Sequence, residues 1–195
     1  MIFDLIRQSL GSSEVKQISS QLGTKPQQTQ QAIAAALPLL LGALDRNSTQ
    51  PQGAAALASA LEQDHDGSIL DNLAGFLRQG DTSPGDGILK HVLGERRQKV
   101  EAGLGQASGL ERQSVSKLLA LLAPIVMGAL GKEKRNQHLD PGGLSGLLRT
   151  EVSSTASSSQ LGGLMALLDS NQDGQVADDI ARMGSQLLSS LFNKK

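Results

Sequence analysis

The sequence contains no cysteine, no tryptophan and no tyrosine, and its aromatic side chains are 3 phenylalanines. The lack of cysteine excludes disulfides, thiol catalysis and cysteine-ligated metals. The scarcity of aromatic rings leaves Leu, Ala, Ile, Val and Met to build the core. These side chains suit close packing between helices and include few strand formers, so we expect an all-α fold.

The sequence also has almost no excess of one charge sign and few long apolar runs. The net charge of -1 gives no global attraction to nucleic acid. The longest apolar run, residues 118–131, is shorter than the roughly 20 residues that span a bilayer, so it predicts a buried core helix and no membrane span. The N-terminus places Asp4 inside an apolar run and lacks the basic segment of a signal peptide. We therefore expect a cytoplasmic protein.

The residues that usually carry catalysis are few and dispersed. The histidines, His65, His91 and His138, lie far apart in the sequence, and neither H-E-x-x-H nor G-x-S-x-G occurs. The charged run at residues 94–99 is typical of an exposed helix face. We therefore expect a protein that is not an enzyme.

What the chain does have is an internal repeat. Residues 33–44 align with residues 118–130, and an offset of 86 places Pro38 on Pro124 and Gly23 on Gly109. Each proline lies within a helical pattern, where it lacks an N–H and collides with the preceding turn. We therefore expect a bend or a break at both prolines.

The repeat predicts a helical bundle built from two pseudo-repeats of about four helices each. The first comprises residues 1–84 and the second residues 85–195, although both together are also compatible with one compact domain. The second copy is longer because of an insertion at about residues 131–160. Its Ser-rich part, residues 152–160, is expected to be a surface loop.

An acidic segment at residues 169–180 has the alternating oxygen pattern of an EF-hand calcium loop, with a glycine at the turn. Asp178 and Asp179 lie one or two positions before the usual final carboxylate. An acidic turn that caps a helix explains the same residues. The equivalent segment of the first copy, residues 62–72, is a poorer match. The candidate calcium ligands are Asp169, Asn171, Asp173, the carbonyl of Gln175, and Asp178 or Asp179.

The duplicated L-P-x-x-x-G-A-L segment, the Gly/Leu-rich middle and the acidic D-x-N-x-D-G-x-V-x-D-D-I segment resemble the YidB-like bacterial domain family, whose function is uncharacterised. The resemblance covers most of the chain. It implies a small, all-helical bacterial protein and supplies no reaction.

Two functional classes remain open at this point. Gly/Leu-rich segments at residues 142–148 and 161–168 predict a module that binds another protein or a second copy of itself, with calcium at residues 169–180 as a possible regulator. The alternative is a DNA-binding helix-turn-helix at residues 15–33. Its second helix would present Gln27, Gln28, Gln30 and Gln31 to the bases, but few cations surround it, which makes nucleic acid a poor candidate partner.

Overall fold

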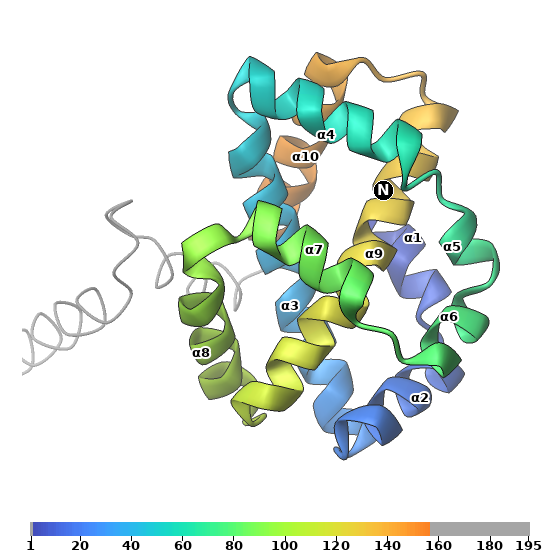
Figure 1. The fold of residues 1–195 in the computed structure, drawn as a ribbon, viewed down its shortest axis with the longest axis vertical. Coiled ribbons are helices and arrows are strands. Elements are labelled where there is room, and N and C mark those ends of the chain that lie inside the picture. Colours follow the sequence, from blue (N-terminus) through green and yellow to red (C-terminus); the bar gives the residue numbers. More distant parts are fainter. Residues whose placement is uncertain (1, 157–195) are drawn as a thin grey trace, which may run out of the picture. The chain divides into compact units, whose positions relative to one another are not determined.

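The computed structural model describes residues 2–156, which form α-helices and one 3-10 helix and contain no strand (Figure 1). This confirms the all-α fold. The elements are α1 (Ile2–Ser9), α2 (Ser12–Leu22), α3 (Pro26–Ser48), α4 (Pro51–Gln63), α5 (Ser68–Asp71), α6 (Leu73–Gln79), α7 (Ser83–Val92), η1 (Gly94–Arg96), α8 (Arg97–Ser108), α9 (Arg112–Asn136) and α10 (Pro141–Ala156).

Glycine and proline set the ends of the helices that pair across the proposed repeat. α2 ends at Gly23 and α8 ends at Gly109, both in the left-handed conformation with φ of 66° and 67°. Such a residue is usually glycine because a side chain is strained there. α3 then begins at Pro26, whose missing N–H costs nothing in a first helical turn.

The helix α9 is the core of the structure. All of residues 118–131 are buried, and α9 contacts α1, α2, α3, α4, α5, α7 and α8 (Figure 1). By length and composition alone α9 is also apolar enough to cross a membrane, but 83% of its most apolar stretch is buried inside the structure. The burial fits the core helix that the apolar run predicted.

Both long helices pass through their prolines without interruption. Pro38 lies inside α3 and Pro124 inside α9, and both prolines are buried. Of the expected bend or break, the break is therefore wrong at both positions, and the bend stays a prediction. Tertiary packing on the apolar faces of these helices outweighs the hydrogen bond that each proline removes. The matched starts, prolines and glycine ends fit an internal duplication, which stays a prediction.

One expectation about boundaries stays a prediction and another differs from the structure. α7 runs across residues 84 and 85, and residues 1–154 form one compact unit, while the division into two pseudo-repeats at this junction stays a prediction. The Ser-rich stretch was expected to be a loop, yet its residues 152–156 continue α10. The Ser-rich composition does not produce a loop at residues 152–156, because Leu144 and Leu148 anchor α10 in the core.

Pro124 leaves the carbonyl of Ala120 without its helical hydrogen bond, and α7 contacts α9 closely at this carbonyl. Pro124 has no N–H to donate to the carbonyl of Ala120, one turn earlier in α9. Gly85 of α7 lies against that carbonyl, and a Cβ atom on Gly85 would be 1.7 Å from the Ala120 oxygen. Glycine is therefore required at residue 85 by space, because the neighbour is backbone and has no rotamer to change.

Gly85→Ala should lower the free energy of unfolding by about 2 kcal/mol or more, since the added methyl forces α7 away from α9. Gly87→Ala is the matched control in the same helix, because a Cβ at Gly87 meets nothing within 4 Å. The control should be neutral or slightly stabilising, as alanine favours helix. Urea denaturation of both variants measures the difference, and equal stabilities would contradict the close contact.

A partly buried ionic network, centred on the buried Glu101, holds α8 in place. Arg97 pairs with Asp86 of α7 at 2.5 Å and with Glu101 at 2.8 Å, and it donates to the hydroxyl of Ser116 in α9 at 3.0 Å. Arg112 approaches the other oxygen of the buried Glu101 at 3.5 Å. The run at residues 94–99 is therefore only partly the exposed face that was expected, because Arg97 turns inward.

Candidate functional site: an apolar cleft between α4 and α7

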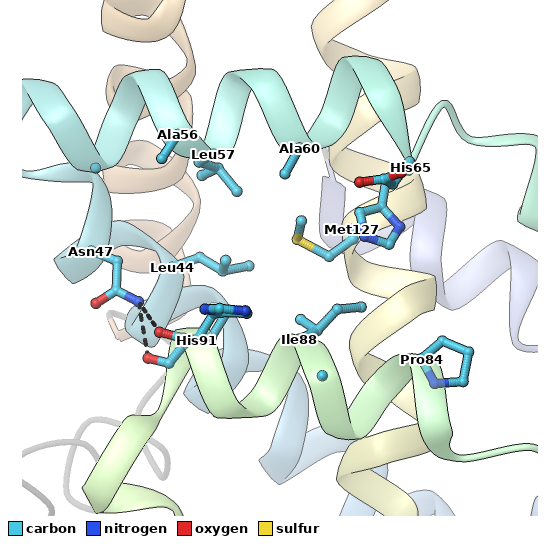
Figure 2. Close-up of a pocket in the computed structure, with 14 residues that line it drawn as sticks. Leu44, Asn47, Ala56, Leu57, Ala60, His65, Pro84, Ile88, His91 and Met127 are labelled. Carbon is cyan, nitrogen blue, oxygen red and sulfur yellow. Dashed lines mark hydrogen bonds between the residues drawn. The ribbon is translucent and has the colours of Figure 1, made fainter.

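A cleft of about 770 Å³ opens between α4 and α7, with Leu44 of α3 and Met127 of α9 at its base (Figure 2). α4 forms one wall and α7 the other, and the two helices run in opposite directions. The lining residues are Leu44, Asn47, Gly53, Ala56, Leu57, Ala60, Asp64, His65, Pro84, Gly87, Ile88, His91, Val92 and Met127.

The α4 wall is made of small, uncharged residues although much of it faces solvent. Residues 51–61 contain no charged side chain, Ala56 is exposed, and Leu57 and Ala60 are half-buried. On the opposite wall, Gly87 is exposed and a Cβ there would enter open space. Exposed helices usually carry charges, so this uncharged wall is typical of a surface that binds another apolar group.

Polar groups stand at the two ends of the cleft (Figure 2). At one end the Asn47 side-chain amide donates to the carbonyl of Val92 at 2.9 Å and to that of His91 at 3.5 Å. These carbonyls end α7, so Asn47 caps that helix and links it to α3. At the other end Asp64 and His65 follow α4. The middle of the cleft is apolar.

His65 is held at its end of the cleft by a close backbone contact. A Cβ atom on Gly131 of α9 would lie 1.8 Å from the carbonyl oxygen of His65. The half-buried imidazole has a lowered pKa, because burial disfavours its charged form, and the charge of Asp64 opposes that shift. The neutral form of His65 is therefore favoured in the folded protein.

His65 should make the folded state less stable as the pH falls below about 6.5, because the unfolded chain then takes up a proton that folded His65 resists. His65→Asn should reduce the pH-dependent loss in the free energy of unfolding. The reduction should be less than about 1 kcal/mol, since a half-exposed group is screened by solvent. Asp64→Asn should steepen it, as the opposing carboxylate is lost. Denaturation curves between about pH 4.5 and 8 measure both changes, and an unchanged slope in His65→Asn would contradict the assignment.

A second hollow of about 500 Å³ adjoins the Asn47 end of the cleft and shares Asn47, His91 and Val92 with it. Its other lining residues are Arg46, Gln50, Leu93, Gly94, Glu95 and Arg96. Two arginines and one glutamate line this hollow, and Asp64 lines the opposite end of the cleft.

The first-copy acidic segment forms a turn held by ion pairs with the end of α9. Asp66 accepts a hydrogen bond from the Ser68 N–H at 3.0 Å and lies 3.6 Å from Arg135. Glu62 pairs with Lys134 at 2.5 Å and Asp71 with Lys132 at 3.4 Å. These contacts match the capped-turn alternative, and residues 2–156 contain no group of acidic and histidine side chains suited to a metal ion.

The predicted calcium loop in the second copy lies outside the described residues. This applies to Asp169, Asn171, Asp173, Gln175, Asp178 and Asp179 alike. The calcium site therefore stays a prediction from the sequence pattern.

The helix-turn-helix outline is present as α2, Gly23 and α3. Of its candidate base-reading residues, Gln28 is already engaged, since its amide donates to the carbonyls of Gly109 at 2.9 Å and Ser108 at 3.4 Å. Gln27, Gln30 and Gln31 are exposed. Gln28 thus ties the start of α3 to the end of α8, and DNA binding stays an untested alternative.

The first Gly/Leu-rich segment contributes mainly to this chain's own core. Leu144 and Leu148 of α10 are fully buried, while Gly142 and Gly146 are exposed on the other side of the helix. The second segment, residues 161–168, lies beyond the described part of the chain. Of the leucines in residues 142–148, only Leu147 is half-buried, and self-association through this segment stays a prediction.

Sequence reasoning missed the cleft because its residues come from α3 and α4, from α7 and from α9, which are separate parts of the chain. One signal pointed toward it, namely the run of uncharged residues at 51–61 in a helix too short to be a core helix. Ile88 and Met127 carry no such signal, since each looks like an ordinary core residue.

The model of a family described as a bacterial protein of unknown function (DUF937) matches residues 4–133. The match includes every residue that lines the cleft. No curated protein and no solved structure matches the chain.

Proposed function

Since the chain belongs to the DUF937 family of bacterial proteins of unknown function, we propose its role from the cleft itself. The protein is a non-enzymatic interaction module that takes an amphipathic helix of a partner protein between α4 and α7. The observation that carries this proposal is the apolar middle of the cleft and its uncharged α4 wall, both open to solvent.

The dimensions of the cleft suit a helix. Its α4 wall extends from Gly53 to Asp64, which corresponds to about 17 Å or three helical turns. Ala56, Ala60 and Gly87 are small, so the backbone of a third helix can approach both walls closely. An occupying helix with apolar residues at the spacing i, i+3 or i+4, and i+7 would cover Leu57 and Ile88.

The open mouth favours a helix over a small apolar molecule. Typical ligand pockets bury most of the surface of a small molecule. Here Ala56, Pro84 and His91 line the cleft and are exposed, so a small ligand would keep one side in water. A helix turns its own polar face outward at the same place, which removes this cost.

The chemistry of the lining also supports binding over catalysis. The cleft, which lies wholly within the described residues, is lined by no Ser, Thr, Lys or Tyr. Asp64 and His65 stand at one end with apolar residues beyond them. These side chains do not place a nucleophile next to a base, as hydrolytic enzymes need.

Ala56→Glu should abolish binding of helical peptides without unfolding the protein, because it places a charge in the apolar contact. The probe is a phage-displayed library of helical peptides about 14 residues long, which exceeds the cleft by roughly a turn. Wild-type protein should enrich peptides with one apolar face, and Ala56→Glu should bind those peptides at least about tenfold more weakly.

Ala55→Glu is the matched control, since Ala55 is the preceding residue of α4, is exposed and does not line the cleft. It should bind the selected peptides like the wild type. The absence of any enriched helix, or equal loss in both variants, would overturn the proposal. A dimer that only Ala56→Glu dissociates in ultracentrifugation would replace the partner helix with a second copy.

We also propose that residues 169–180 bind calcium, on the strength of the oxygen pattern in the sequence. Calorimetric titration of the whole chain with calcium should give a heat of binding that Asp173→Ala removes. Asp66→Ala, at the aligned position of the first copy, should leave the heat unchanged because Asp66 pairs with Arg135. Lack of heat in the wild-type protein, or equal heats in magnesium, would refute a calcium-specific site.

A further inference from the structure

We propose that the partner helix carries a lysine or arginine at one end of its apolar face, and that this residue pairs with Asp64. This inference rests on the helix-binding function proposed above and specifies the chemistry of the partner. It concerns the end of the cleft at which α4 stops.

Asp64 continues the side of α4 that faces the cleft. The α4 wall and its end contribute Gly53, Ala56, Leu57, Ala60 and Asp64 to the lining. Residues spaced by three or four share one face of a helix, so Asp64 follows Leu57 and Ala60 on the same face. The N–H of Asp64 donates to the carbonyl of Ala60 at 3.0 Å. A helix lying along this wall therefore ends beside the Asp64 carboxylate, at the end of the cleft that His65 marks in Figure 2.

The basic side chains at the end of α9 are each paired with another acid of the same region. The pairs are Lys132 with Asp71 at 3.4 Å, Lys134 with Glu62 at 2.5 Å, and Arg135 with Asp66 at 3.6 Å. Within residues 2–156 the exposed carboxylate of Asp64 has neither an ion pair nor a hydrogen bond. Its negative charge is therefore available to a cation that enters with the partner.

The charge of Asp64 distinguishes the two ends of the cleft. Its neighbour His65 does not offset it near neutral pH, because burial lowers the pKa of the imidazole and favours the neutral form. At the other end Arg96 and Glu95 line the same hollow with opposite charges, and Arg46 is already engaged in another interaction. An incoming helix thus meets one uncompensated charge among these lining residues, and that charge is negative.

The ion pair would set the direction and register of the docked helix more than its affinity. Exposed ion pairs contribute little to binding because water screens them, so the apolar contacts with Leu57 and Ile88 supply most of the affinity. Complementary charges at the edge of an interface instead select one orientation and disfavour the reverse. A helix with its basic residue beside Asp64 should therefore be preferred over the same helix turned around.

The test selects the same phage-displayed helical library against the wild-type protein and Asp64→Lys at about pH 8, where His65 is neutral. The wild type should enrich Lys or Arg at one end of the apolar face. Asp64→Lys should enrich Asp or Glu at that end. A selected basic peptide should bind Asp64→Asn about threefold more weakly than the wild type.

Glu111 supplies the matched controls, Glu111→Lys and Glu111→Gln, which change the net charge equally. It is exposed, lines neither the cleft nor the hollow, and precedes α9 at the opposite end of that helix from Gly131. Both controls should behave like the wild type. The selected peptide with glutamine in place of its basic residue should bind the wild type and Asp64→Asn equally, because the pair is then absent from both complexes.

The outcomes separate this inference from the function on which it rests. Failure to enrich any helix would overturn both. Apolar helices that lose affinity in Ala56→Glu but show no preference for a basic end would keep the function and overturn the inference. Equal weakening by Asp64→Asn and Glu111→Gln would also overturn it, because the effect would then follow net charge. A wild-type dimer that Asp64→Asn weakens would replace the partner with a second copy of this chain.

Discussion

The contact between Gly85 and the carbonyl of Ala120 is the constraint on which the arrangement of the bundle depends. Pro124 deprives that carbonyl of its helical hydrogen bond, and Gly85 lets α7 approach the backbone of α9 at that position. The close approach brings α7 onto the buried core helix. Because α7 is also one wall of the cleft, the same contact sets where that wall stands.

The other wall depends on a comparable contact between backbones. Gly131 of α9 lies against the carbonyl of His65, just after α4 ends. α9 therefore positions both walls through glycines at backbone contacts, while Met127 lies between these two points at the base of the cleft. Close-packed backbones do not deform readily, so we expect the cleft to keep its shape when the proposed partner helix binds.

Charged side chains lie near both ends of the cleft. Arg97 joins α7, α8 and α9 through Asp86, Glu101 and Ser116, and its neighbour Arg96 lines the hollow beside the cleft. At the opposite end Glu62, Asp66 and Asp71 pair with the basic end of α9. An acidic segment that resembled a metal loop in sequence thus fastens the α4–α5 turn to the core helix.

The sequence by itself determined the helices, their glycine ends and the burial of residues 118–131, because these follow from local periodicity and from the conformations open to glycine and proline. Only the tertiary structure decided that α3 and α9 continue through Pro38 and Pro124, since burial of their neighbours outweighs one lost hydrogen bond. It also decided the cleft. No local pattern marks Asn47, Ile88 and Met127, and they meet because separate helices pack together.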